Sequence, residues 1–294
     1  MPLRLRWLAS HSASALHAAL AIAREQTLVD AELAAALTPA TNELRREMAM
    51  AGLPVARFWR MLCALATTFD NNRQLAKMAL YRTIGQASPQ EVSERLGGRL
   101  SDLEAALLRY KPNIVEELSL RGRPLREQWE ARGPGMLRQI FASTDARLEV
   151  DVADVVLVLP ALGGGGEAQL HNNSVRMEAV LANPHAQLPE TVRLAWMLSQ
   201  LHLDLPFLSE GIPLDRLPML AALAMIPPAL AAAQYVELVQ MNDDLVRFAI
   251  DAWRVPVPPS IDPVDVVMRW WDAYELSRPP LEVAFRALDE MVGD

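Results

Sequence analysis

The sequence predicts a mainly α fold of the α+β class, a helical protein with a small β-sheet of about three strands in its middle. Apolar residues recur at helical spacing near both ends of the chain, residues 148–159 are rich in β-branched side chains, and residues 174–181 alternate between two faces. The 294 residues are 51% hydrophobic and 22% charged, which is typical of a soluble globular protein. Such a chain is long enough to bury a large core.

Helix signals dominate residues 1–122. Proline follows Ser88, and Glu91 lies three residues after it, which is the pattern of a capping box. Gly97 and Gly98 are expected to end this helix, and a new one is expected to begin shortly afterwards. We therefore expect consecutive helices throughout this part of the chain.

The middle of the chain predicts strands and one central helix. Four glycines, Gly163 to Gly166, follow the β-branched run, and we expect a hairpin connection there. Residues 174–181 predict an edge strand, although Met, Glu, Ala and Leu are good helix formers and leave a helix as the alternative. Pro189 and Glu190 begin a helix that reaches about His202. Its buried side chains are expected to include Leu194, Leu198 and Leu201.

These elements divide the chain into three regions. Residues 1–122 form a helical N-terminal region, residues 123–206 an α+β core, and residues 207–294 a helical C-terminal region packed on that core. Residues 217–236 include no charged side chain and have about the length of a membrane span. Because prolines interrupt this stretch, we expect two buried helices there and no membrane span.

Composition argues against several classes of protein. The net charge is −8, and 36 acidic against 28 basic side chains argue against nucleic-acid binding, which needs clustered lysine and arginine. Residues 1–147 carry 20 basic and 15 acidic side chains, so the excess of negative charge lies in the second half. The single cysteine, Cys63, rules out an intramolecular disulfide framework. We expect a cytoplasmic protein, and nothing in the sequence indicates its oligomeric state.

No catalytic or metal-binding motif is complete in the sequence. None of the five histidines lies three or four residues from another, so we expect no metal site. The glycine run lacks both the Gly-Lys-Ser/Thr ending and the acidic partner of nucleotide-binding loops, so we expect no cofactor. The Gly-x-Ser-x-Gly motif of serine hydrolases is also absent from the sequence.

Residues 124–203 run in a particular order: a long helix, two strands, a glycine-rich loop, an edge strand, and a helix that begins at Pro189 and Glu190. This order resembles the core of the zincin-type metallopeptidases, in which the last helix carries the HExxH motif. Where that motif should lie, this sequence reads Arg193-Leu194-Ala195-Trp196-Met197. Two metal ligands and the general base are therefore missing. The resemblance implies a zincin-like fold without zinc chemistry, and it supplies no site residues.

Two functions remain for such a chain. The first is a non-catalytic interaction or scaffold protein with a protein or peptide partner, descended from a peptidase-like fold. The alternative is a metallopeptidase-like hydrolase with a site near residues 163–190. The candidate residues for this alternative are His171, Asn173, Glu178 and Glu190.

A groove beside the predicted edge strand is the expected binding place. If residues 174–181 form a strand, Arg176 and Glu178 share one face about 7 Å apart, because a strand rises near 3.3 Å per residue. They are then expected to flank a groove next to the Pro189 helix, where an extended peptide could add by main-chain pairing. If the segment is helical, no such groove exists.

Overall fold

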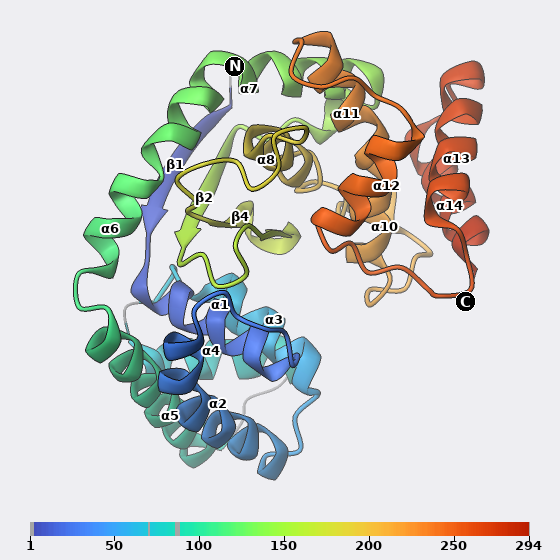
Figure 1. Cartoon of the computed structure of the whole chain (residues 1–294). Helices are drawn as coiled ribbons and strands as arrows, with labels where there is room; N and C mark the ends of the chain where they lie inside the picture. Colours follow the sequence, from blue (N-terminus) through green and yellow to red (C-terminus); the bar gives the residue numbers. More distant parts are fainter. Residues whose placement is uncertain (1–2, 70, 86–88, 294) are drawn as a thin grey trace.

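The computed structural model describes residues 3–69, 71–85 and 89–293. It is mainly helical with a small mixed sheet, which confirms the predicted fold class. In Figure 1 the sheet lies left of centre, the first helices lie below it, and the C-terminal helices lie on the right. Ser88, the expected helix cap, falls outside the described residues.

Helices make up both ends of the chain. The helices that precede the second strand are α1 (His11–Ala23), α2 (Ala31–Met50), α3 (Val55–Leu65), α4 (Asn72–Ile84), α5 (Gln90–Tyr110), α6 (Ile114–Arg121) and α7 (Arg123–Ser143). The helices that follow the last strand are α8 (Glu190–Leu198), α9 (Pro206–Ser209), α10 (Leu217–Ala224), α11 (Ile226–Tyr235), α12 (Asp243–Ala252), α13 (Pro263–Ser277) and α14 (Leu281–Val292).

The sheet has the strand order β1-β2-β4-β3. Its strands are β1 (Arg4–Ala9), β2 (Val152–Val158), β3 (Gly166–Gln169) and β4 (Ser174–Glu178). β1, β2 and β4 are parallel, and β3 is antiparallel to β4. Residues 4–9 were expected in a helical region, so β1 corrects that expectation. It pairs with a strand that lies more than 140 residues further along the chain, and a short N-terminal segment gives no local sign of such a partner.

The strand predicted at residues 174–181 exists, but it is not an edge strand. β4 lies between β2 and β3, and it ends at Glu178. All five of its residues are buried, because α1 packs on one face of the sheet and α8 on the other. Arg176 and Glu178 are therefore interior side chains and do not flank a surface groove. β3 is the edge strand on that side of the sheet.

Helix α5 runs unbroken through Gly97 and Gly98, where the sequence predicted a helix end. A Cβ atom on Gly97 would lie 2.9 Å from the Cα of Arg73 in α4. Gly97 therefore allows two helix backbones to approach closely, and it does not terminate a helix.

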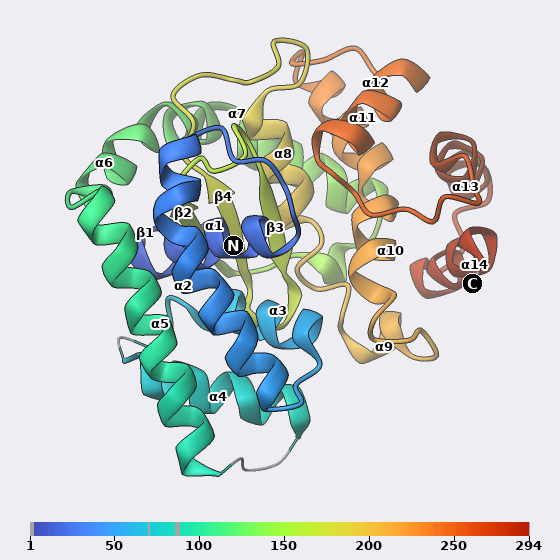
Figure 2. The same ribbon diagram turned by 60° about the horizontal axis from the view of Figure 1, so that its bottom comes forward.

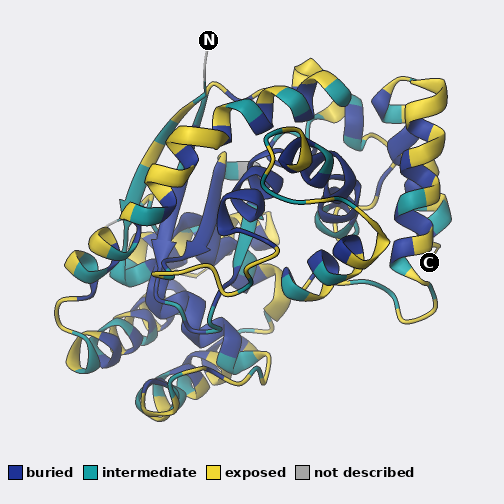
Figure 3. Ribbon diagram, turned by 45° about the horizontal axis from the view of Figure 1, so that its top comes forward, coloured by how far each residue is buried: buried dark blue, intermediate teal, exposed yellow. Residues whose placement is uncertain are grey.

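The central helix α8 is buried on every side. Leu194, Leu198 and Leu201 are at most 1% exposed, which confirms their predicted burial. The helix ends at Leu198 and not near His202, so Leu201 lies in the turn that follows it. Figure 3 shows this helix and the inner strands β2 and β4 mostly in dark blue, the colour of buried residues. The two helices predicted in residues 217–236 are α10 and α11. Within the described residues, Leu217–Tyr235 is the one stretch long and apolar enough to cross a membrane, and 78% of it is buried inside the protein.

Candidate functional site

A buried carboxylate lies at the C-terminal end of β4. Glu178 is fully buried, and its Oε1 atom lies 2.6 Å from Nε2 of His17 in α1. The same oxygen accepts a hydrogen bond from the backbone N–H of Leu162 at 2.8 Å. The other oxygen, Oε2, accepts one from the N–H of Gly164 at 2.7 Å. Three donors from two distant segments therefore hold one carboxylate.

The glycine run binds this internal carboxylate instead of a phosphate. It connects β2 to the edge strand β3, which are not neighbours in the sheet, so the expected hairpin connection was wrong. Gly163 and Gly164 have positive φ angles of 76° and 129°, which favour glycine, and they aim the loop's N–H groups at Glu178. Arg254 fixes the loop from the outside, because its guanidinium donates to the carbonyl oxygens of Gly164 at 3.1 Å and Leu162 at 3.2 Å.

The pair of His17 and Glu178 is best described as a neutral imidazole and a carboxylate. Burial lowers the pKa of His17, more than its hydrogen bond to Glu178 raises it. Burial also opposes ionisation of Glu178, but the hydrogen bonds from His17, Gly164 and Leu162 together hold the pKa of this carboxyl below its usual range. A neutral imidazole then donates its Nε2–H to the carboxylate.

A second buried pair lies at the start of α8. Oε1 of Glu190 and Nη2 of Arg193 are 3.3 Å apart, with both side chains at most 3% exposed. Burial raises the pKa of Glu190 and lowers that of Arg193, since each charge has lost its water. Nη2 of Arg193 also donates to the carbonyl of Ala252 at 3.3 Å. In the described structure neither oxygen of Glu190 has a hydrogen-bond partner, nor do Nε and Nη1 of Arg193.

Residues 193–197, which stand where the HExxH motif of a zincin would lie, are tightly packed in the core. Arg193 to Met197 are all at most 4% exposed. Trp196 stacks on Trp253 with ring centroids 4.5 Å apart, and its indole N–H donates to the carbonyl of Ala222. A Cβ atom on Gly166 would meet the sulfur of Met197 at 2.8 Å. Apolar and aromatic contacts thus occupy this face of α8.

The four candidate residues do not come together. Glu178 and Glu190 lie close enough that the charge on Glu178 raises the pKa of Glu190. Asn173 is exposed at the opposite end of β4, five residues before Glu178, which corresponds to about 16 Å along a strand. The side chain of His171 lies outside the described part of the structure. Among the described residues, no group of three or more His, Cys, Asp or Glu side chains is arranged to hold a metal ion.

An ion pair between the buried Arg176 and the partly exposed Glu167 lies on the α1 side of the sheet. Nη2 of Arg176 donates to Oε2 of Glu167 at 2.6 Å. Burial raises the pKa of the nearby thiol of Cys63, more than the charge of Arg176 lowers it. Cys63 is therefore a neutral, buried thiol, and it lacks the accessible setting of a nucleophile.

The surface is hollowed next to α3, in a place that sequence reasoning missed. This hollow, here called the arginine groove, has a volume of about 770 Å³ and is lined by Pro54, Val55, Ala56, Arg57, Arg60, Met61, Arg82, Leu214 and Asp215. Arg57 and Arg60 belong to α3, and Arg82 belongs to α4, more than twenty residues further along the chain. Single arginines on the exposed side of a helix are common. The sequence therefore gives no sign that these three arginines lie together.

The arginine groove continues into a narrow slot beside β3. The slot has a volume of about 30 Å³ and lies between Glu167–Leu170 of the strand region, α3 and the first turn of α10. Arg60, Met61 and Leu214 line both hollows. Figure 2 shows β3 at the outer edge of the sheet, with α3 below it and α10 beyond it.

Three residues of the edge strand β3, Glu167, Ala168 and Gln169, line this slot. The N–H of Glu178 donates to the carbonyl of Gly165, so this cross-strand pair is hydrogen-bonded. Hydrogen-bonded and non-bonded pairs alternate along an antiparallel ladder. In the observed register, Gly166 and Ala168 are therefore the residues whose N–H and C=O groups point away from β4.

A second surface groove, of about 880 Å³, lies between the loop after β4 and the helices α11 and α12. It is lined by amide and acidic side chains that include Gln187, Glu237 and Asp244, and by Phe248. Its lining includes no arginine or lysine, so its charge is opposite to that of the arginine groove.

Comparison with known proteins gave no relative. The scan against protein-family models, the search of curated proteins and the search of solved structures each found no match. The site must therefore be interpreted from its own geometry.

Proposed function

We propose that the protein is a non-catalytic interaction protein that binds an extended peptide segment of a partner along the free edge of β3. The observation that carries this proposal is that Ala168, whose main-chain N–H and C=O groups point away from β4, lines the slot that shares Arg60, Met61 and Leu214 with the arginine groove. An exposed strand edge pairs readily with another extended chain, because its N–H and C=O groups lack strand partners.

The buried polar groups support a non-catalytic role. The carboxylate of Glu178 is held by His17 and two backbone N–H groups, and Glu190 faces Arg193. All four side chains are at most 6% exposed, so a substrate could not reach them without rearrangement of the core. A general acid or base must lie within hydrogen-bond reach of its substrate. These groups therefore suit the interior of a zincin-like core that has lost its chemistry.

A bound strand requires a small adjustment of the surface. The slot beside β3 holds about one water molecule at its present volume of about 30 Å³. We expect residues 214–218, which form its outer wall, to shift outward when a peptide enters. Main-chain hydrogen bonds then provide affinity, and the side chains that reach the arginine groove provide selectivity.

The test uses a fluorescein-labelled, threonine- and glutamate-rich extended peptide and measures its fluorescence anisotropy on titration with the whole protein. A second peptide of the same sequence carries N-methyl groups at alternate backbone positions, which removes its strand hydrogen bonds but keeps its side chains. We expect binding of the first peptide and at least tenfold weaker binding of the second. Equal affinity for both peptides contradicts strand addition.

A matched protein variant probes the same edge. Ala168→Pro removes the outward N–H of β3, and proline is tolerated on an edge strand where its missing N–H faces solvent. We expect the variant to keep the thermal melting temperature within a few degrees and to lose peptide binding. One equivalent of zinc in the purified protein, measured by elemental analysis, overturns the non-catalytic proposal.

A further inference from the structure

We propose that the arginine groove selects peptides with clustered acidic side chains, so that the partner of this protein carries an Asp- or Glu-rich segment next to its strand-forming stretch. This inference rests on the proposed peptide-binding function and names the chemistry of the ligand. It derives from the charges that line the groove.

Three guanidinium groups line the groove, and Asp215 is the single carboxylate among the lining residues. Arg57, Arg60 and Arg82 make no ion pair with any described residue, whereas the neighbouring Arg73 of α4 pairs with Glu94. Three guanidinium groups therefore gather in one groove without an ion-paired carboxylate. A local positive surface on a protein of net charge −8 favours an anionic ligand.

Two of the three arginines, Arg82 and Arg57, are held in place by neutral hydrogen-bond partners, which leave their charge uncompensated. Nη1 of Arg82 donates to the side-chain oxygen of Asn172 at 2.8 Å, and Asn172 in turn donates to the carbonyl of Ala64 at 3.0 Å. Nη2 of Arg57 lies 3.4 Å from the carbonyl of Arg82. Arg60, half-buried between the groove and the slot, has no hydrogen bond to a described residue. A carboxylate placed there can accept hydrogen bonds in the planar geometry that guanidinium groups prefer.

The N-terminal turn of α3 adds to the positive potential. Pro54 precedes the helix and makes no capping hydrogen bond, and the first turn from Val55 to Arg57 lines the groove. The N–H groups of a helix's first turn point outward along its axis and carry the positive end of the helix dipole. The guanidinium groups determine the preference for an acidic peptide, and these N–H groups add to the same positive potential.

Continuity with β3 explains why the anion should belong to a peptide. Arg60, Met61 and Leu214 line both the slot and the groove, so a chain paired with β3 leaves the slot directly over the arginines. An acidic side chain within a few residues of the paired stretch can then reach them. A basic peptide in the same position is repelled, which gives the groove its selectivity.

The experiment compares three labelled peptides with the same strand-forming half and a second half that contains three Glu, three Gln or three Lys residues. Anisotropy is measured with the whole protein at 50 and 300 mM NaCl. We expect the Glu peptide to bind about tenfold more tightly than the Gln peptide at low salt, which corresponds to about 1.4 kcal/mol. The advantage should shrink at high salt, and the Lys peptide should bind least.

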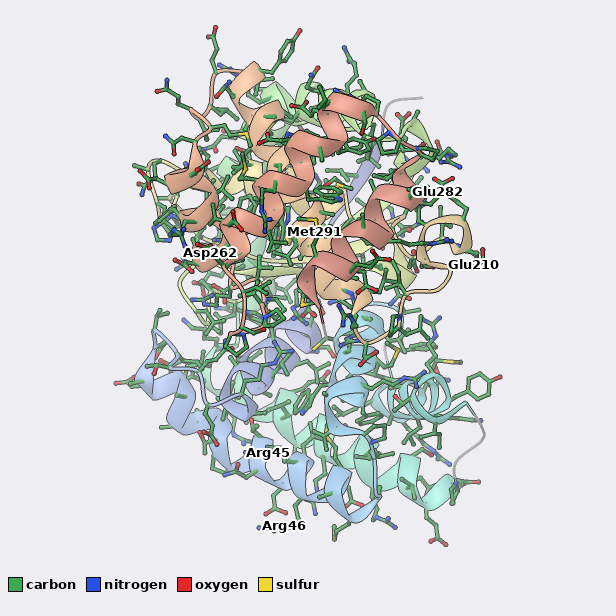
Figure 4. All side chains as sticks on the ribbon, turned by 90° about the vertical axis from the view of Figure 1, so that its right-hand side faces the viewer. Arg45, Arg46, Glu210, Asp262, Glu282 and Met291 are labelled. Carbon is green, nitrogen blue, oxygen red and sulfur yellow. The ribbon has the colours of Figure 1, made fainter. Side chains whose placement is uncertain are left out.

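Charge-changing variants show whether the preference for the Glu peptide arises in the arginine groove. Arg57→Glu changes a groove residue that does not line the slot, and it should abolish the preference for the Glu peptide while the Gln peptide binds nearly as before. Arg45→Glu makes the same change of charge on α2, away from the groove, and should keep the preference (Figure 4). Asp215→Asn removes the one acidic lining residue and should strengthen binding of the Glu peptide severalfold.

The possible outcomes separate the two proposals. If the Glu and Gln peptides bind equally and Ala168→Pro still abolishes binding, strand addition stands and acidic selection is overturned. If neither peptide binds, both proposals fail. If Arg57→Glu and Arg45→Glu reduce binding of the Glu peptide equally, the preference is a nonspecific charge effect and the inference is overturned. If a phosphoserine version binds more than a hundredfold more tightly than the Glu peptide, the ligand class is phosphate and not carboxylate.

Discussion

Nε2 of His17 lies 2.6 Å from Oε1 of Glu178, although 161 residues separate the two in the chain. The contact joins the first helix to the end of the inner strand β4, and backbone N–H groups of Leu162 and Gly164 complete it. Because both side chains are buried, the charge state of this pair contributes directly to the stability of the fold.

This pair predicts a loss of stability in mild acid. The pKa of His17 is lower in the folded protein than its ordinary value of 6.5, so the unfolded chain binds more protons as the pH falls. The stabilisation from neutral His17 is present above pH 6.5 and is lost as the pH falls below it. Urea unfolding between pH 8 and pH 5.5 should show the decrease.

His17→Gln is the matched variant, because a glutamine can still donate to Glu178 but cannot titrate. It should flatten the pH dependence in this range. His11→Gln, at the start of the same helix, should leave the dependence as it is. An unchanged slope in His17→Gln would mean that other groups cause the acid sensitivity.

Replacement of Glu190 predicts a large loss of stability. Glu190→Ala removes the nearest carboxylate from the buried guanidinium of Arg193, and breaking a buried pair in this way costs about 3–5 kcal/mol. The double variant Glu190→Leu, Arg193→Met replaces both charges with apolar side chains and should recover most of that loss. Denaturant titrations of the single and double variants measure the coupling. A double variant less stable than Glu190→Ala contradicts this interpretation.

Leu198 tests the central position of α8. The side chain is 1% exposed, and Leu198→Ala should lower the free energy of unfolding by about 2–5 kcal/mol. Leu276 is 90% exposed, so Leu276→Ala should change it by less than about 0.5 kcal/mol. Urea titration of both variants gives the comparison, and a loss below 1 kcal/mol for Leu198→Ala would place α8 outside the core.

We predict that position 164 requires glycine, because its backbone conformation and its close neighbours leave no room for a side chain. Its φ is +129°, and a Cβ atom there would lie 2.6 Å from Cγ of Pro184. Gly164→Ala should therefore cost at least about 1–3 kcal/mol, the usual range for backbone strain of this kind. Gly98→Ala, on an exposed helical position with no atom within 4 Å of the new Cβ, should instead stabilise by about 0.5–1 kcal/mol. Melting temperatures that shift in the same direction for both variants would contradict the requirement for glycine at position 164.

The sequence carried enough local information to predict the main elements. The fold class, the strand beginning at Ser174, the burial of Leu194, Leu198 and Leu201, and the two helices within residues 217–236 are all present in the structure. Hydrophobic periodicity and proline positions determine these features, because each depends on neighbours within a few residues of the same segment.

The sequence did not predict the partners of those elements. β1 was missed, and β4 was placed at the edge of the sheet, because parallel strands pair across long stretches of helix and leave no local mark. Gly97 and Gly98 resemble a helix end by composition, yet a close approach of α4 explains Gly97. Arg176 and Glu178 alternate with apolar residues as surface side chains do, but helices cover both faces of the sheet.

The sequence by itself determined a mainly helical protein with a small sheet, a buried central helix, and the absence of an HExxH motif at the start of that helix. Only the tertiary structure decided that Glu178 is held by His17 and the glycine loop, and that Arg57, Arg60 and Arg82 share one groove. The physical reason is distance along the chain. Periodicity encodes which face of a segment is buried, whereas the pairing of charges across the core and the gathering of charges on the surface exist only after the segments have packed.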